Sequence, residues 1–257
     1  MILMRPFFIA LQFLTRLSIV HQDNWTEEDF GKSVKFFPLV GAVLGLIYAA
    51  FIYIFLTLLP AHGVIVPHHF LMAFMLVLPP LMTGGLFCDG FMDTMDGVFS
   101  GRERERMLEI MKDSRVGSNA VFSFVVLMIF EYGILLDMDA SILLPAFFVR
   151  PVIAMMMMTI GIECYPYARK KGLGKFFSDM ANRKSLVFAT VMALIFVVPW
   201  GRLAWLSYIV CLLFTMFFAR FVTKKLGGLT GDVYGAINTL NEGLVMLVFL
   251  FGHAAGL

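Results

Sequence analysis

Residues 70–97 read FLMAFMLVLPPLMTGGLFCDGFMDTMDG, an apolar run that passes directly into a segment with three aspartates. Runs of about 20 apolar residues match the thickness of a bilayer's hydrocarbon layer. Over the 257 residues, 60% are apolar and 15% charged, against about 25% charged in a typical soluble domain. Comparable runs lie near 36–59, 70–87, 119–136, 142–162, 185–200, 203–223 and 236–256. We therefore expect an all-α fold, a polytopic integral membrane helical bundle of about seven transmembrane helices (six to eight), forming one domain over 1–257.

The basic residues fall almost entirely in alternate segments between these runs. Only Arg150 and Arg202 lie elsewhere; the others are Arg5, Arg16, Lys32, Lys35, Arg102, Arg104, Arg106, Lys112, Arg115, Arg169, Lys170, Lys171, Lys175, Arg183, Lys184, Arg220, Lys224 and Lys225. Loops rich in Lys and Arg stay in the cytoplasm. The pattern predicts a protein of the cytoplasmic (inner) membrane, surrounded by lipid, with its N-terminus and its chemistry on the cytoplasmic face. A net charge of +2 gives no reason to expect a nucleic-acid partner.

The N-terminal stretch 3–19 is apolar but contains Arg5 and Arg16. It predicts an amphipathic or interfacial helix, with an extra span as the alternative. The methionine run Met155–Met158 lies inside a predicted span and is expected to face lipid or to fill packing space. The sequence is compatible with a homo-oligomer but carries no signal for one.

The three aspartates define the most informative pattern. On a helix, Asp89, Asp93 and Asp96 fall within about 60° of arc, so their carboxylates project from one face. Oxygen ligands without a nearby imidazole or thiolate cluster favour a hard ion, and Mg²⁺ commonly combines a few carboxylates with substrate phosphates. Mn²⁺ can replace it. The alternative is that these aspartates cap helices or face water at the membrane boundary.

The charged segment that follows, 102–118, has two parts. Its first half mixes signs at helical spacing and could be a self-paired, solvated helix surface. Its second half brings together Lys112, Asp113, Ser114 and Arg115. Arg115 is suited to clamp a diphosphate, and Asp113 to hold a second metal ion or to orient a nucleophile.

These two blocks together are similar to the cobalamin synthase family. The matching stretches are TGGLFCDGFMDTMDG (83–97) and RERMLEIMKDSRVGS (104–118), with further blocks at 15–16, 37–41, 167–174 and 226–242. Asn119 departs from the pattern, where a glycine is expected soon after the serine. The resemblance implies a magnesium-dependent membrane transferase that joins α-ribazole, or its 5′-phosphate, to adenosylcobinamide-GDP with release of GMP.

The resemblance also suggests roles for individual residues. Asp89, Asp93, Asp96 and Asp113 are expected to serve catalysis and metal binding, with Asp96 or Asp113 as the base. Substrate contacts are expected from Lys112, Ser114, Arg115, Arg16, Arg150, Arg169, Thr230, Asp232, Asn241 and Glu242. For Arg150 a structural pair with Glu131 or Glu163 competes with that role, because a guanidinium inside a membrane needs a partner. For the basic segment 169–184, membrane orientation competes with binding.

Two rival functions use similar carboxylates. A CDP-alcohol phosphotransferase also places aspartates at the end of a membrane helix, but its first Asp-Gly is followed by Ala-Arg, where this chain has Phe91-Met92. A cation-coupled transporter would spread acidic residues through the depth of the bilayer, whereas most of them gather on one side here.

Overall fold

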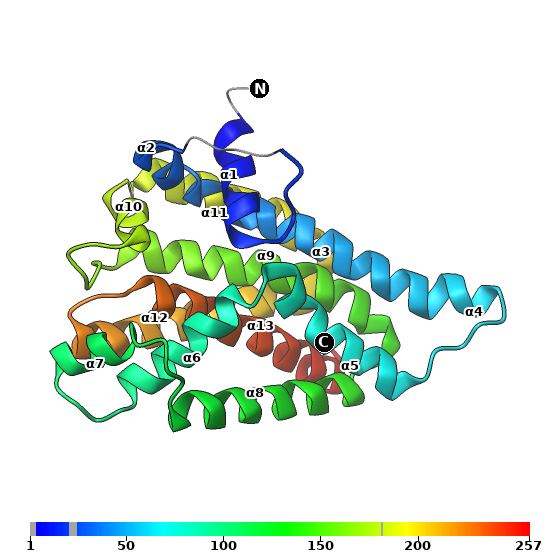
Figure 1. The fold of residues 1–257 in the computed structure, drawn as a ribbon. Coiled ribbons are helices and arrows are strands. Elements are labelled where there is room, and N and C mark those ends of the chain that lie inside the picture. The colour runs from blue at the N-terminus through cyan, green and yellow to red at the C-terminus, as the bar shows by residue number, and fades with distance from the viewer. Residues whose placement is uncertain (1–3, 21–24, 181) are drawn as a thin grey trace.

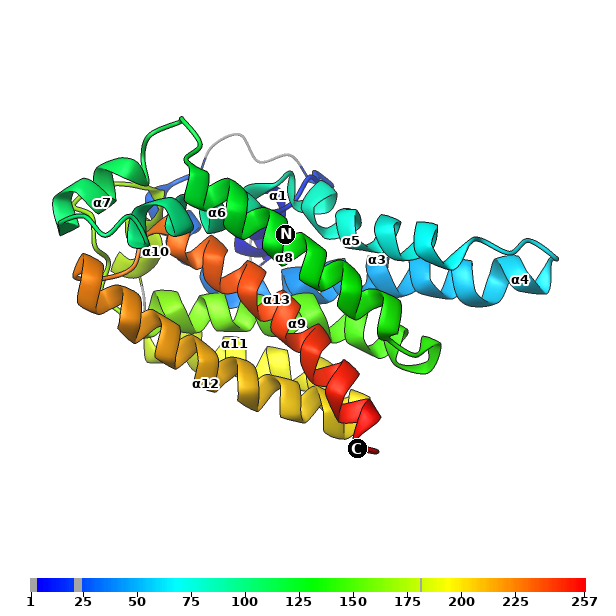
Figure 2. The ribbon, with the colours of Figure 1, turned by 90° about the horizontal axis from the view of Figure 1, so that it is seen from below.

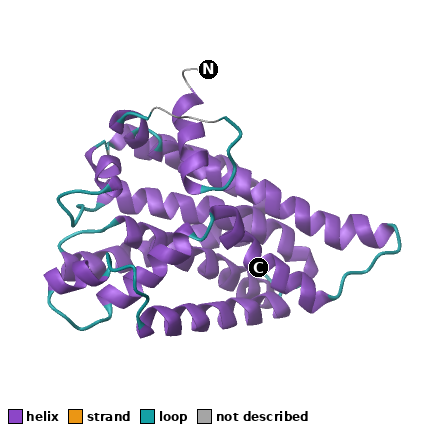
Figure 3. Cartoon of the chain, viewed as in Figure 1, coloured by secondary structure: helices purple, strands orange, loops and turns teal. Residues whose placement is uncertain are grey.

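The structure is a computed structural model that describes residues 4–20, 25–180 and 182–257. Residue 3 of the N-terminal stretch and residue 181 of the basic segment therefore lie outside the described residues. Within the described part the regular elements are helical (Figures 1 and 3). One isolated parallel β-bridge in that part joins Tyr167 to Leu229. The α-helices are α1 (Arg5–Leu14), α2 (Glu27–Gly31), α3 (Phe37–Tyr53), α4 (Leu59–Ala61), α5 (His68–Thr83), α6 (Leu86–Val98), α7 (Arg104–Ile110), α8 (Ser118–Asp137), α9 (Ala140–Cys164), α10 (Leu173–Asp179), α11 (Arg183–Val197), α12 (Gly201–Leu226) and α13 (Gly231–Ala254).

These helices confirm the predicted all-α membrane fold. By length and composition, the described residues contain five helical segments able to cross a membrane, or six if the bent pair α5–α6 is one span. That count treats 183–226 as one segment of 44 residues. A turn of 3-10 helix (Val198–Trp200) divides it into α11 and α12.

The helices α11 and α12 run in opposite directions along α9. The Asn182 N–H at the start of α11 donates to Glu163 near the end of α9 (2.5 Å), whereas Trp200 at the turn packs on Phe148 in the first half of α9 (4.9 Å). The second half of α12 returns to the first end, where Tyr165 donates to the carbonyl of Met216 (3.2 Å). Counting the two separately raises the number of crossing segments from six to seven, within the predicted range.

Helix α9 is the axis of the bundle. It packs against α3, α11, α12 and α13, and most of its length is buried (Figures 1 and 2). Met155, Met156, Met157 and Met158 are all buried. The four methionines therefore fill packing space inside the bundle and do not face lipid.

Two glycines let α3 lie directly on the α9 backbone. A Cβ at Gly41 would be 2.5 Å from the carbonyl oxygen of Pro151, and one at Gly45 would be 2.3 Å from that of Phe148. One turn separates the two glycines, so they form one small-residue contact of the kind that lets membrane helices approach closely.

The bend between α5 and α6 decides where the aspartates lie. Gly84 and Gly85 both have positive φ (63° and 77°), and the two helices meet at 91°. The Arg16 N–H donates to the Met82 carbonyl just before the bend (2.7 Å), which ties the end of the N-terminal segment to it. Helix α1 has 10 residues and buries Ile9, Leu11 and Leu14, so it packs against the bundle and is too short to be a span.

The glycine contact predicts a specific loss of stability. Gly45→Ala should lower the melting temperature in detergent, because its methyl group would meet the Phe148 carbonyl and overpacking costs about 1–3 kcal/mol. Gly133→Ala is the control, since a Cβ there meets nothing within 4 Å. Equal melting temperatures for the two variants would contradict the close contact.

Candidate functional site

Helix α6 carries Asp89, Asp93 and Asp96 as predicted, and a backbone contact places it against the start of α13. A Cβ at Gly90 would lie 2.7 Å from the carbonyl oxygen of Asp232, and one at Gly235 would lie 3.3 Å from the Gly90 Cα. A side chain at Gly90 would collide with the α13 backbone, and one at Gly235 would make a tight contact with α6. The crossing therefore brings Asp232 of α13 beside the aspartates of α6.

Four charged groups meet at this crossing. Arg169 Nη2 lies 2.8 Å from Asp232 Oδ2, and Asp93 is within electrostatic range of Asp232, Asp89 and Arg169. The Thr230 hydroxyl donates to Asp232 (3.2 Å) and accepts from the Val233 N–H (3.3 Å), which caps α13. The structure thus brings together five of the predicted site residues, from α6, α13 and the segment after α9.

The segment that presents Arg169 is held by its backbone. Ala168 N–H donates to the Leu229 carbonyl (2.7 Å), and Leu229 N–H donates to the Pro166 carbonyl (2.8 Å). Arg104 links this segment to the end of α12 by donating to the carbonyls of Leu226 (2.7 Å) and Ala168 (3.2 Å). Arg104 therefore joins distant segments and is not only part of a solvated helix surface. Its partners lie 64 and 122 residues away, and no local sequence pattern indicates them.

Two cavities flank Asp89. We name them by their lining: the aromatic cavity, of about 250 Å³, has Tyr167, Phe177 and Tyr234 among its walls. The arginine cavity, of about 600 Å³, is lined by Arg16 together with Thr15, Thr83 and Cys88. Asp89 lines both, so it stands where the two cavities adjoin. Arg16 was predicted as a site residue, whereas Tyr167 and Tyr234 were not, although both lie inside stretches that resemble the family.

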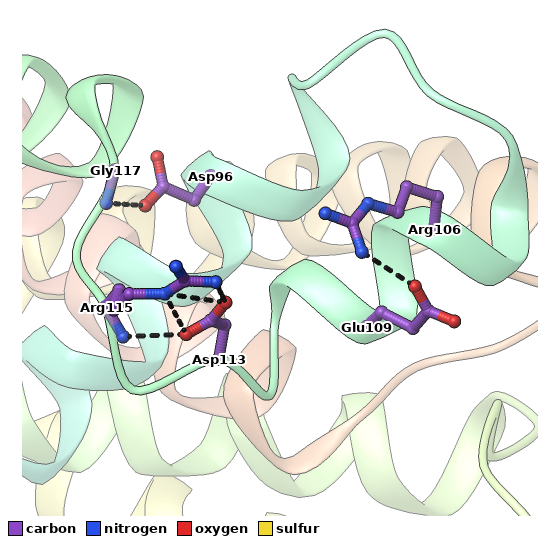
Figure 4. A network of polar contacts seen from close by, with 6 residues as sticks. All are labelled: Asp96, Arg106, Glu109, Asp113, Arg115 and Gly117. Carbon is purple, nitrogen blue, oxygen red and sulfur yellow. Dashed lines mark hydrogen bonds and ion pairs between the residues drawn. The ribbon is translucent and has the colours of Figure 1, made fainter.

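Asp96 faces a different part of the molecule from Asp89. Its carboxylate accepts the N–H groups of Gly117 (2.5 Å) and Ala120 (2.9 Å), at the positive end of α8 (Figure 4). A carboxylate there satisfies N–H groups that have no partner within their own helix. For Asp96, the geometry is that of the capping alternative.

The segment Lys112–Arg115 lies outside both cavities. Arg115 donates to Asp113 from Nε (3.0 Å) and from Nη2 (2.6 Å), so the guanidinium predicted to clamp a diphosphate clamps its neighbour instead (Figure 4). These hydrogen bonds hold the pKa of Asp113 down at about 2, which makes it a poor proton acceptor near neutrality.

Arg150, Asn241 and Glu242 lie deeper in the bundle, and none of them lines either cavity. Arg150 pairs with Glu131 and Glu242, both at 3.0 Å. Of the two predicted partners, Glu131 is therefore right and Glu163 wrong. The Asn241 amide donates to Thr215 of α12 (2.9 Å), so these residues join helices.

No group of three or more His, Cys, Asp or Glu side chains within the described residues is arranged to hold a metal ion. Asp89 and Asp93 nevertheless make no side-chain hydrogen bond or salt bridge with another described residue. Unpaired carboxylates beside one another in a partly buried cleft repel, and a cation relieves that repulsion. The donor chemistry of this pair therefore fits a hard divalent ion.

Comparison with known proteins gives one consistent result. Residues 6–250 match the family model described as cobalamin-5-phosphate synthase. A protein of Desulfitobacterium hafniense (strain Y51) named adenosylcobinamide-GDP ribazoletransferase is 37% identical over 255 residues, covering 97% of this chain and 96% of that one. Proteins of the same name from Clostridium acetobutylicum and Caldanaerobacter subterraneus are 34% and 35% identical, covering 93% and 96% of this chain and 92% and 98% of theirs. No solved structure matches.

The capping geometry of Asp96 predicts how its variants behave. Asp96→Ala should lower the melting temperature, because loss of a helix cap costs about 1 kcal/mol. Asp96→Asn keeps one of the two acceptor oxygens, so it should lose less stability than Asp96→Ala and retain turnover close to that of the unmodified protein. An Asn variant that folds normally and has no turnover would contradict a purely capping role.

The buried ion pairs predict a larger effect. Arg150→Met should destabilise the protein by about 3–5 kcal/mol, because it leaves two buried glutamates without their cation. Adding Glu131→Gln and Glu242→Gln should restore part of the loss. Arg202→Met, at an exposed position, is the control, and thermal unfolding in one detergent compares all of them. An Arg150→Met protein as stable as the control would contradict the pairing.

Proposed function

The chain belongs to the cobalamin-5-phosphate synthase family, and from that premise we propose that it is an adenosylcobinamide-GDP ribazoletransferase. The proposal rests on one observation above the others: Asp89 lines two adjoining cavities, one aromatic and one with an arginine. A transferase with two substrates needs both of them to meet at the reacting atoms. Membership of this family excludes the two alternative functions, the CDP-alcohol phosphotransferase and the transporter.

In the proposed reaction a ribose hydroxyl of α-ribazole, or of its 5′-phosphate, attacks the phosphorus linked to cobinamide. The bond from that phosphorus to the oxygen of the GMP phosphate breaks, and GMP leaves with the electron pair. The hydroxyl proton passes to a carboxylate. We assign that role to the pair Asp89 and Asp93, whose carboxylates have no side-chain partner among the described residues, because Asp96 caps α8 and the Asp113 carboxylate is held by Arg115. Arg16, in the arginine cavity, would bind the diphosphate.

We propose that Asp89 and Asp93 hold Mg²⁺ together with substrate phosphates, and Mn²⁺ can take its place. When bound, the ion neutralises charge on the bridging and leaving oxygens. This assignment uses two carboxylates, a number common at magnesium sites that substrate phosphates complete. Asp232 is already paired with Arg169, and both side chains line the aromatic cavity together with Asp89.

We further propose that this site faces the cytoplasm. The contacts of Arg104 with Ala168 and Leu226, and of Lys225 with the Val98 carbonyl (3.2 Å), bring three basic segments to the end of the bundle where the aspartates lie. By the positive-inside rule, that end and the N-terminal segment packed beside it would face the cytoplasm.

The test is a transferase assay on the protein in lipid nanodiscs, with adenosylcobinamide-GDP, α-ribazole 5′-phosphate and Mg²⁺. We expect GMP and the joined corrinoid to appear in equal amounts, and chelation of the metal to stop both. Asp89→Ala and Asp93→Ala should each lower kcat by about 100-fold or more, since a general base and a metal ligand contribute at least that much.

Asp137→Ala is the matched control, because Asp137 ends α8 at the other end of the bundle and is exposed. It should keep the activity of the unmodified protein. A correctly inserted protein that makes neither product would refute the proposed function. Full activity in both the Asp89 and Asp93 variants would leave the reaction in place and refute the assigned site.

A further inference from the structure

The aromatic cavity has walls unlike those of the arginine cavity. Six aromatic side chains from six parts of the chain line it: Phe13, Phe37, Phe87, Tyr167, Phe177 and Tyr234. Among the described residues of its lining, Asp89, Arg169 and Asp232 are those with a charged side chain, and they belong to the α6–α13 crossing. The cavity is therefore aromatic on most sides and ionic where it meets the site.

The rings present both faces and edges. Tyr167 and Tyr234 lie 6.4 Å apart with an angle of 36° between their planes. Phe177 of α10 meets Phe13 of α1 and Phe37 of α3 edge to face, at 5.9 and 5.5 Å. Such walls favour a flat aromatic ligand, because ring pairs contribute about 0.5–1.5 kcal/mol beyond the burial of their area.

Four flat groups occur in the substrates of the proposed function: the corrin ring, the adenine of the adenosyl ligand, guanine and the base of ribazole. A corrin ring is too large, because a cavity of about 250 Å³ is smaller than the pockets of about 300–1,000 Å³ that hold drug-sized ligands. Guanine carries a carbonyl, an amino group and a ring N–H on one edge, and burying these without partners costs about 1–3 kcal/mol each. The wall formed by Met158, Ile162 and Phe37 offers no polar side chain to these groups, or to the amino group and ring nitrogens of adenine. Away from the ionic end, the polar side-chain groups of the lining are the hydroxyls of Tyr167 and Tyr234. The base of ribazole, a benzimidazole, has a single free ring nitrogen.

We infer that the aromatic cavity binds the base of the acceptor ribonucleoside, with its ribose at the Asp89 end. The inference rests on the proposed function and goes beyond it by assigning one substrate to one cavity. With the ribose there, its attacking hydroxyl meets Asp89 where the arginine cavity begins. The diphosphate of the other substrate then occupies the arginine cavity, on the opposite side of the same carboxylate.

Met158 follows from this assignment as a residue that selects the size of the base. Helix α9 contributes Met158 and Ile162, one turn apart, as the wall on the side of the bundle core. Met155, on the same helix and equally buried, does not line the cavity. Shortening Met158 lengthens the space for the base, whereas shortening Met155 does not.

The experiment compares two acceptors, the benzimidazole ribonucleoside and one with a larger, tricyclic base. For Met158→Ala, the ratio of kcat/KM for the larger base to that for benzimidazole should rise about tenfold, since a change of this size in an apolar pocket is worth about 10-fold or more in discrimination. The KM for adenosylcobinamide-GDP should stay within about twofold. Met155→Ala should lose similar packing and leave the ratio unchanged.

The outcomes separate the two proposals. If the unmodified protein joins no acceptor to the corrinoid, the proposed function fails, whatever Met158 does. If it is active and Met158→Ala leaves the ratio unchanged, or alters the KM for adenosylcobinamide-GDP instead, the assignment of the aromatic cavity is overturned. An equal change of the ratio in Met155→Ala would also overturn it, because the effect would then come from loosened packing.

Discussion

The close contact between α6 and α13 is the constraint on which the site depends. With Gly90 against the backbone of Asp232, and Gly235 against that of Gly90, the two helices approach until main chain meets main chain. Asp232 can then act on one substrate together with Asp89 and Asp93, which lie 143 and 139 residues earlier in the sequence. A methyl group at Gly90 would push the two helices apart, so the charge cluster depends on the absence of a side chain there.

The molecule handles buried charge in two ways. In the middle of the bundle, Arg150 lies between Glu131 and Glu242, and the three side chains are almost fully buried. These side chains neutralise one another's charges, and their ion pairs link α8, α9 and α13. At the end of the bundle, Asp89 and Asp93 have no such partner. Carboxylates without a cationic partner at a cleft can bind a metal cation or the positively charged part of a substrate complex. This distinguishes a binding site from a structural ion pair.

Sequence reasoning succeeded where a local rule fixes the geometry. A helix determines that Asp89 and Asp93 share a face, and the thickness of the bilayer determines the length of the spans. It failed where a partner comes from a distant part of the chain. Asp96 lies on the predicted helix, yet its direction depends on Gly117 and Ala120 at the start of another helix.

The same limit explains the remaining differences. Arg115 was predicted to bind a diphosphate from its place in the cluster with Lys112, Asp113 and Ser114, and nothing in that cluster showed that Arg115 would pair with Asp113. The aromatic cavity was beyond reach for another reason: its rings come from α1, α3, α6, α10, α13 and the segment after α9, and each reads in sequence as ordinary packing. Convergence of such residues is a property of the tertiary fold. The chemistry of the site can therefore be inferred from its aspartates, whereas the choice of substrate requires the three-dimensional arrangement around them.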